Sequence, residues 1–199
     1  MRIAIIGGGK MGRAIAALAV EFTSPDAAPV NLARLIEAGI PTVTGTTGWS
    51  AELPRITELV LKRRGALLHA ANFSVGVHLF LRAARDLARA FAGRPEFDAY
   101  LVEEHHAAKA DAPSGTGLAL QRRLRDADAG RTFPITSIRA GSIPGTHLVS
   151  YDGPFESVTL SHVARSRQIF AAGALAAAEW LPGHTGVFTF EEMLFGEKS

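Results

Sequence analysis

Short apolar runs alternate with amphipathic stretches along the first third of the chain. The apolar runs, which we expect to be strands, are residues 2–6, 20–23, 41–44 and 66–70. The stretches with apolar residues at helical spacing are residues 10–19, 24–38 and 51–64. Strands that alternate with helices in this way predict a parallel sheet built from βαβ units.

The pattern changes after Asn72. A long apolar helix is expected at residues 75–91, and the segment 97–104 alternates like a half-exposed strand. The remaining expected elements are a loop at 105–113, a helix at 116–127, strands at 135–140, 147–151 and 157–163, and a helix at 173–181. We therefore expect an α/β protein with two domains. A parallel-sheet domain would take residues 1–72 and 168–199, and a mixed-sheet α+β domain residues 73–167.

Composition narrows the functional classes. The 199 residues include no cysteine, which excludes disulfide scaffolds, thiolate metal sites and cysteine nucleophiles. Hydrophobic residues make up 47% and charged residues 20%, which is ordinary for a globular protein. No apolar run approaches the roughly 20 residues that cross a bilayer, and the apolar stretch before Gly7 is too short for a signal peptide. We expect no membrane contact and a cytoplasmic location.

The charge pattern argues against nucleic acid as a partner. The net charge is only +2, and the basic clusters at residues 62–64 and 122–125 have no aromatic residues among them. Clusters of this kind are typical of solvated helix faces.

A glycine-rich turn follows the first expected strand and precedes the first expected helix. It reads G-x-G-x-x-G, with Lys10 and Met11 before Gly12. Glycines let the backbone turn and approach a pyrophosphate, which a helix N-terminus can bind. A plain turn is the alternative, but the flanking strand and helix favour a Rossmann-like nucleotide site. Small residues after two later strands would lie along the same sheet edge, at 45–48 and 70–73.

The segment from Glu104 to Thr116 combines titratable groups with the start of a helix. His105, His106 and Lys109 fall at the end of an expected strand, and residues 114–116 open a helix whose N–H groups can bind carboxylates. Reduction of an anionic unsaturated substrate needs such a combination, because an acid must supply a proton as hydride arrives. The alternative is structural: adjacent histidines on a strand face opposite ways, and a lone lysine can be a surface charge. The spacing does not favour a metal site.

The segment E-x-H-H-x-x-K-x-D-A-P-S-G-T, which ends at Thr116, resembles the signature of the 4-hydroxy-tetrahydrodipicolinate reductase (dihydrodipicolinate reductase) family of bacterial lysine biosynthesis. The resemblance extends over nearly the whole chain. Its other segments are residues 22–25, 45–48, 71–77, 139–141, 145–147 and 166–174.

The resemblance implies that the first domain binds NADH or NADPH and that the second holds a cyclic dicarboxylate and builds a homotetramer through its sheet. It implies that 4-hydroxy-tetrahydrodipicolinate loses water and is reduced to tetrahydrodipicolinate, with His105 as catalytic histidine and Lys109 as proton donor. It assigns substrate binding to His106, Ser114, Gly115 and Thr116, and no metal. The residues that it assigns to the cofactor are Gly7, Gly9, Lys10, Met11, Gly12, Gly45, Thr46, Thr47, Ala70, Ala71, Asn72, Phe73 and Arg167.

One part of a Rossmann-like domain is expected to be absent. Val20 begins a strand directly after the helix expected to end at Ala19, whereas such connections usually take about 2–6 residues. Residues 22–25 also resemble a later strand of the family, so the second strand, the next helix and the third strand are missing. Either the chain is shortened, or the sequence joins the flanks of an unobserved segment. The residue that reads the adenosine ribose, and with it the choice between NADH and NADPH, belongs to that part.

Two other functions fit parts of the sequence. The absent strand favours a binding protein that kept the scaffold but lost its dinucleotide affinity, whereas the retained His105, His106 and Lys109 argue against it. An amino-acid dehydrogenase could share the first domain, but the E-x-H-H-x-x-K segment and the S-G-T that follows argue against that function.

Overall fold

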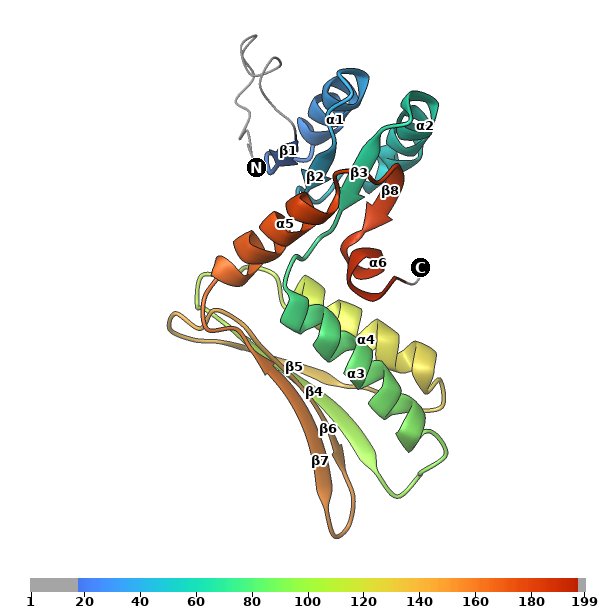
Figure 1. Ribbon diagram of the computed structural model, residues 1–199. Helices are drawn as coiled ribbons and strands as arrows, with labels where there is room; N and C mark the ends of the chain where they lie inside the picture. The colour runs from blue at the N-terminus through green and yellow to red at the C-terminus, as the bar shows by residue number, and fades with distance from the viewer. Residues whose placement is uncertain (1–17, 197–199) are drawn as a thin grey trace. The chain divides into compact units, whose positions relative to one another are not determined.

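The computed structural model describes residues 18–196, whose contacts divide into two compact units. One unit comprises the chain up to Ser74 together with the segment from Gln168, and the other is Val75–Arg167. Each unit has its own sheet (Figure 1). Each also has its own hydrophobic core. The expected strand at 2–6, the glycine-rich turn and most of the expected helix at 10–19 lie outside the described residues.

The sheet of the first unit, sheet A, has four parallel strands in the order β1-β2-β3-β8. The strands are β1 (Ala19–Glu21), β2 (Thr42–Thr44), β3 (Ala66–His69) and β8 (Gly186–Thr189). The helices are α1 (Ala28–Glu37), the 3₁₀ turn η2 (Ser50–Glu52), α2 (Leu53–Arg63), α5 (Gln168–Trp180) and α6 (Phe190–Phe195). This order confirms the parallel α/β sheet predicted from the sequence.

Helices pack on both faces of sheet A because β3 presents apolar side chains on both sides. One face, with Leu67 of β3, packs against α1 and α2. The other face, with Val43 and Leu68, packs against α5 and Phe190. A parallel strand that is buried on both faces reads in the sequence as a continuous apolar run.

Three details of the first unit differ from the sequence prediction. Ala19 begins β1 instead of ending a helix, because it pairs with Thr42 and its amide donates to the Pro41 carbonyl oxygen at 2.9 Å. Helix α5 begins at Gln168, ahead of the predicted start at Gly173. Strand β8 and helix α6 were not predicted, since four residues form a strand here only by pairing with β3.

The sheet of the second unit, sheet B, is mixed, as predicted. Its order is β5-β4-β6-β7, with β4 parallel to β5 and antiparallel to β6, and β6 antiparallel to β7. The elements of this unit are α3 (Val75–Phe91), β4 (Asp98–His105), α4 (Gly115–Ala127), β5 (Ile135–Arg139), β6 (Thr146–Asp152) and β7 (Ser157–Val163).

Helices α3 and α4 pack against each other and cover one face of sheet B (Figure 1). Helix α3 buries Val77, Phe80, Leu81, Ala84 and Ala88, the stripe expected of a helix with one apolar face. These residues pack against the apolar side of the sheet, which includes Leu101, Val149 and Tyr151. The core thus supports the strands on the face that also carries the candidate site.

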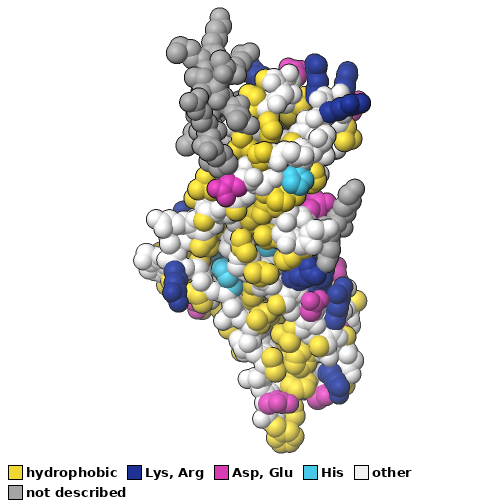
Figure 2. All heavy atoms as spheres, viewed as in Figure 1, with side chains coloured by type: hydrophobic (Ala, Val, Ile, Leu, Met, Phe, Trp, Pro, Cys, Tyr) yellow, Lys and Arg dark blue, Asp and Glu magenta, His cyan; other side chains and the backbone are white. Residues whose placement is uncertain are grey.

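The other face of sheet B has no covering element among the described residues. Tyr100, Ile138 and Val163 are each at least 40% exposed. Figure 2 shows hydrophobic side chains at the tip of the β6–β7 hairpin, where Pro154 and Phe155 are exposed. Within residues 18–196, no helix has the length and apolar character needed to span a bilayer.

Candidate active site

Strand β4 directs two titratable side chains into the protein at its carboxyl end. Ala99, Leu101, Glu103 and His105 are buried, and the residues between them are more exposed. The alternation predicted from the sequence is therefore confirmed, with the apolar inner face changing to polar at Glu103. His106 follows the strand and is only half-buried, so the adjacent histidines have different surroundings.

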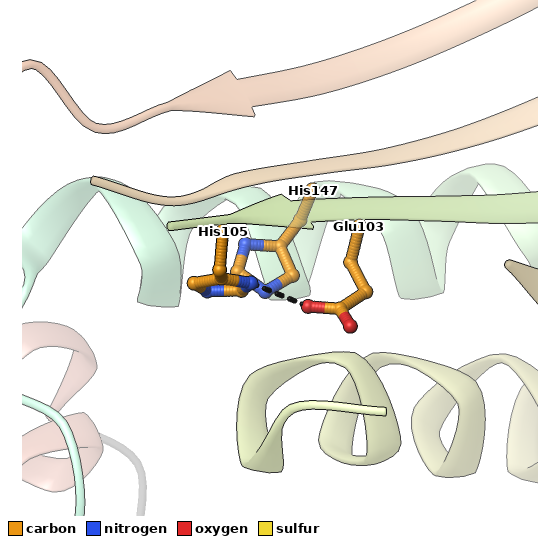
Figure 3. Close-up of side chains that lie close together, drawn as sticks. All are labelled: Glu103, His105 and His147. Carbon is orange, nitrogen blue, oxygen red and sulfur yellow. Dashed lines mark ion pairs between the residues drawn. The ribbon is translucent and has the colours of Figure 1, made fainter. Parts of the chain in front are cut away.

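The strand register determines which residues meet Glu103 and His105. Glu103 lies opposite His147 of β6 and opposite Ser137 of β5, and His105 lies opposite Arg139. Figure 3 shows the side chains of Glu103, His105 and His147 on the same side of the sheet. Three strands therefore contribute to one polar cluster.

Glu103 is the centre of this cluster. Its Oε1 lies 2.6 Å from Arg139 Nη2 and accepts the backbone N–H of Ser114 at 3.3 Å, while its Oε2 lies 2.5 Å from His105 Nδ1. Burial by itself would raise the pKa of Glu103. Hydrogen bonds from the side chains of Ser137, Arg139 and Ser114 outweigh that effect and lower the pKa to about 2. The carboxylate is therefore ionised at neutral pH.

The two buried histidines are neutral at the same pH. Burial lowers the pKa of His105, against the attraction of Glu103 and with help from the charges of Lys109 and Arg139. Burial also lowers the pKa of His147, to about 4. The two rings lie 5.2 Å apart in an edge-to-face arrangement, so a proton on one disfavours a proton on the other.

Lys109 and the start of helix α4 share one carboxylate. Lys109 Nζ lies 2.6 Å from Asp111 Oδ1. The backbone N–H of Gly115 hydrogen-bonds the same carboxylate, and the bond from Lys109 is the main reason that the pKa of Asp111 is lowered. The ammonium group and an amide of the helix N-terminus therefore lie close enough to bind one small anion together.

Ser114 is the N-cap of helix α4. Its Oγ accepts the backbone N–H of Gly117 at 3.1 Å and lies 3.1 Å from His147 Nε2. A serine in this position satisfies one of the unpaired N–H groups at the start of a helix. The helix consequently begins at Gly115, one residue before the predicted start at Thr116.

His106 and Arg167 lie together in an open pocket of about 360 Å³ that also includes Ser142 and Pro144. Arg167 Nη2 is 2.8 Å from His106 Nε2. Since a guanidinium can only donate, His106 Nε2 is the acceptor in this bond. The arrangement places Arg167 beside a residue expected to bind substrate, whereas the sequence resemblance placed it near the cofactor.

The other expected cofactor residues lie at one edge of sheet A or outside the described residues. Gly45-Thr46-Thr47 directly follows β2, and Ala70 to Phe73 directly follows β3. Phe73 is 2% exposed as a whole residue, and its ring packs 5.1 Å from that of Phe190, so the ring belongs to the hydrophobic core of this unit. The expected residues outside the described range are Gly7, Gly9, Lys10, Met11 and Gly12.

One group of side chains has the donor atoms of a metal site. Glu103, His105 and His147 each offer one atom, and these atoms lie within 4.8 Å of one another. The guanidinium of Arg139 already binds the same carboxylate at 2.6 Å, and its positive charge opposes a cation there. The cluster therefore suits an ion-pair network better than a metal.

Sequence models of one family match most of the chain. The model described as "Dihydrodipicolinate reductase, C-terminus" matches residues 76–194, and the model of the N-terminus matches residues 16–73. The chain belongs to the dihydrodipicolinate reductase family. The N-terminal match begins after the glycine-rich segment, and the C-terminal match includes α5, β8 and α6 of the first unit.

The chain is similar to named proteins of the dihydrodipicolinate reductase family. The 4-hydroxy-tetrahydrodipicolinate reductase of Christiangramia forsetii is 35% identical over 189 residues, which cover 89% of this chain and 79% of that protein. The protein of the same name from Methanosarcina barkeri is 34% identical, over 88% of this chain and 72% of that one. The dipicolinate-bound dihydrodipicolinate reductase of Paenisporosarcina sp. TG-14 has the same fold, with a TM-score of 0.76 at 22% identity, over 89% of this chain and 73% of that one.

Sequence reasoning assigned no role to Glu103, Arg139 or His147. The first residue of the E-x-H-H segment is Glu103, and its alternation with His105 was a signal that the two share a face. Arg139 and His147 carried no local signal, because the register of β4 with β5 and β6 brings them to Glu103.

Proposed function

We propose that this protein reduces 4-hydroxy-tetrahydrodipicolinate to tetrahydrodipicolinate with NADH or NADPH, as a cytoplasmic enzyme of diaminopimelate and lysine biosynthesis. Membership of the dihydrodipicolinate reductase family gives the reaction class. The observation that carries the proposal is the carboxylate of Asp111, which Lys109 and the Gly115 amide bind together. A site that binds an internal carboxylate in this way has the chemistry to bind a carboxylate of the substrate.

The residues of the second unit have separate roles in proton transfer and in substrate binding. The ammonium of Lys109 supplies the proton that balances the hydride, because it is cationic and lies where an anionic ring would bind. The amides of Gly115 and Thr116 bind one ring carboxylate at the N-terminus of α4, and the Ser114 amide, which donates to Glu103 Oε1, holds the start of that turn in place. His106 and Arg167 bind the other carboxylate in their shared pocket. His105, which is neutral, accepts a hydrogen bond in the site.

The described residues of sheet A fit a dinucleotide. Residues 45–47 and 70–73 end neighbouring parallel strands, the position at which such sheets bind ligands. An added Cβ at Gly45 would lie 2.1 Å from the ring of Phe22, so a side chain there would require that exposed ring to move. When bound, NADH or NADPH supplies the hydride. We assign its contacts to these two loops and to the glycine-rich segment that precedes the described residues.

We also propose that the protein forms a homotetramer through sheet B. The outer face of this sheet exposes Tyr100, Ile138 and Val163, and the hairpin tip exposes Phe155 almost completely, at 99%. Apolar side chains exposed together are typical of protein interfaces. Light scattering after gel filtration gives the assembly mass directly, and a monomer at micromolar concentration would contradict this proposal.

The reaction is tested by following nicotinamide oxidation with enzymatically generated 4-hydroxy-tetrahydrodipicolinate. We expect oxidation of NADH or NADPH that depends on the substrate. Calorimetry with each nucleotide distinguishes the reductase from the alternative functions. Binding of a nucleotide without turnover would contradict the proposed reaction. If neither nucleotide binds, the result would favour a binding protein that has lost its dinucleotide affinity. The intact mass of the purified chain shows whether residues between Ala19 and Phe22 are absent from the protein assayed.

A further inference from the structure

Glu103 is a buried charge to which the proposed reaction gives no role. Its side chain is 1% exposed, on the inner face of β4. An ionised carboxylate is costly to bury unless other groups bind it. Here Arg139, His105 and the Ser114 amide all lie within 3.3 Å of its oxygens. Each of these three groups belongs to a different part of the candidate site. His105 is the expected catalytic histidine, Arg139 contacts the loop that carries Lys109, and Ser114 caps helix α4.

We propose that Glu103 is a positioning residue that fixes His105 and, through Arg139 and Ser114, the two segments that bind the substrate's anionic groups. The proposal rests on the proposed function for its effect on turnover. Its effect on His105 is a property of the protein alone and can be measured without substrate.

The first consequence concerns the protonation of His105. His105 Nδ1 and Glu103 Oε2 lie 2.5 Å apart, and although burial lowers the pKa of His105, the charge of Glu103 and a hydrogen bond between the two side chains act in the opposite direction. An ionised carboxylate only accepts, so the proton of the neutral ring resides on Nδ1. The lone pair is therefore on Nε2. That atom lies beside Gly145, where an added Cβ would be 3.2 Å away.

The second consequence concerns the loop that carries Lys109. Arg139 Nη2 binds Glu103 Oε1 at 2.6 Å and also donates to the carbonyl oxygen of Asp111 at 2.6 Å. The side chain of Asp111 in turn binds Lys109. Glu103 thus holds the guanidinium that anchors the loop, and a neutral residue in its place would release Arg139.

The third consequence concerns the N-terminus of α4. The N–H of Ser114 donates to Glu103 Oε1 at 3.3 Å, and Ser114 Oγ lies 3.1 Å from His147 Nε2. Two strands of sheet B therefore hold the residue that begins the anion-binding turn. A catalytic group and its binding groups need this kind of support, because small displacements in a site reduce turnover strongly.

The test compares Glu103→Gln with Glu104→Gln, the same substitution one residue along the strand on the more exposed face. Nitrogen NMR of the histidine rings in the full chain reads the tautomer of His105. We expect Nδ1–H in the wild type and in Glu104→Gln, and a mixture with Nε2–H in Glu103→Gln. We expect kcat to fall about 100-fold in Glu103→Gln, the loss that a displacement of about 1 Å in a catalytic site can cause, with a changed pH profile and little change in NADH affinity.

The outcomes for the role of Glu103 can be distinguished from those for the proposed function. Nε2–H in the wild type, or an unchanged tautomer in Glu103→Gln with kcat within threefold of wild type, would overturn the proposal. If Glu103→Gln fails to fold, Glu103→Asp keeps the charge and moves it away from His105. The tautomer of His105 and kcat are then measured in Glu103→Asp and interpreted in the same way. Zinc added to the wild type is expected to leave the His105 resonances unchanged, and a shift at one equivalent would assign the cluster to a metal instead. Absence of turnover in the wild type contradicts the proposed function and leaves the tautomer result intact.

Discussion

Glu103 and His105 are two residues apart on one face of strand β4, with Oε2 of the first 2.5 Å from Nδ1 of the second. Side chains at this spacing on a strand point the same way, so the pairing is a direct result of the local geometry. It places an ionised carboxylate next to a neutral histidine in the part of the chain that resembles the family signature. The following predictions concern the groups that surround this pair.

Replacing Lys109 by alanine tests the proton donor. We expect kcat to fall at least about 100-fold, because general acids contribute about 10²–10⁴-fold. The affinity for NADH, measured by calorimetry, should change little, since the proposed nucleotide contacts lie elsewhere in the chain. Lys62→Ala, which removes an exposed lysine of α2, is the control. Turnover within a few-fold of wild type would remove Lys109 from the role of acid.

Replacing Asp111 by asparagine tests whether its carboxylate competes with substrate. The internal carboxylate binds the Lys109 ammonium and the Gly115 amide, which a substrate carboxylate would also need. We expect KM for the substrate to fall several-fold in Asp111→Asn. Asp126→Asn removes an exposed acid of α4 and should leave this KM unchanged. A higher KM in Asp111→Asn would show that the carboxylate supports the site instead of occupying it.

Replacing Arg167 by alanine decides between the two expectations for this residue. The contact with His106 and their shared pocket favour a role in substrate binding. We expect KM for the substrate to rise about tenfold or more, the size of a charge-assisted hydrogen bond, with KM for NADH within twofold. Arg165→Ala, two residues away and exposed, is the control. If only KM for NADH rises, the result would instead support a role of Arg167 in cofactor binding.

Replacing Gly145 by alanine tests how closely the His105 ring is held. Gly145 has a φ of +150°, and an added Cβ would lie 3.2 Å from His105 Nε2. We expect a lower kcat in a folded protein, because the ring must move away from the new methyl group. Gly141→Ala is a matched control, since its φ is also positive, at +48°, and nothing lies within 4 Å of the added atom. Equal loss of kcat in both variants would assign the effect to the backbone alone.

The neutral state of His147 predicts an acid-sensitive second unit. Its pKa is lowered by burial from 6.5 to about 4, and His105, His162 and Lys109 add to the effect against Glu103. A lowered folded-state pKa means that the unfolded chain binds the proton first. The contribution of His147 to the free energy of unfolding is therefore fully present above pH 6.5. It is lost as the pH falls from 6.5 towards 4, which lowers that free energy by about 3 kcal/mol at most.

His147→Gln keeps a side-chain nitrogen for Ser114 and removes the titration. We expect the protection factors of the β6 amides, which are the intrinsic exchange rates divided by the observed rates, to fall less between pH 6.5 and 4 in this variant than in the wild type. Exchange is the suitable measurement because Trp49 and Trp180 both lie in the other unit. His184→Gln changes an exposed histidine of the first unit and is the control. The same acid response in His147→Gln and wild type would contradict the prediction.

The amino-acid sequence by itself determined most of the order of the elements and the nature of the chemistry. Apolar runs and helical spacing gave α3 at residues 75–91 and the alternation of β4, because both periods are local properties of the chain. The E-x-H-H-x-x-K segment also gave the family. Strand β8 was not predicted, since four residues are too few to distinguish a strand from a loop without the neighbouring β3.

Only the tertiary structure decided which groups hold the site together. Arg139 and His147 are far from Glu103 in sequence and meet it through the register of three strands. Register depends on how whole strands pack against α3 and α4, so no single residue encodes it. Arg167 is likewise far from His106 in the sequence, because strands β5, β6 and β7 lie between the two residues. They come into contact only in the folded protein. Local periodicity thus selects the residues that can react, and long-range packing sets their charges and their neighbours.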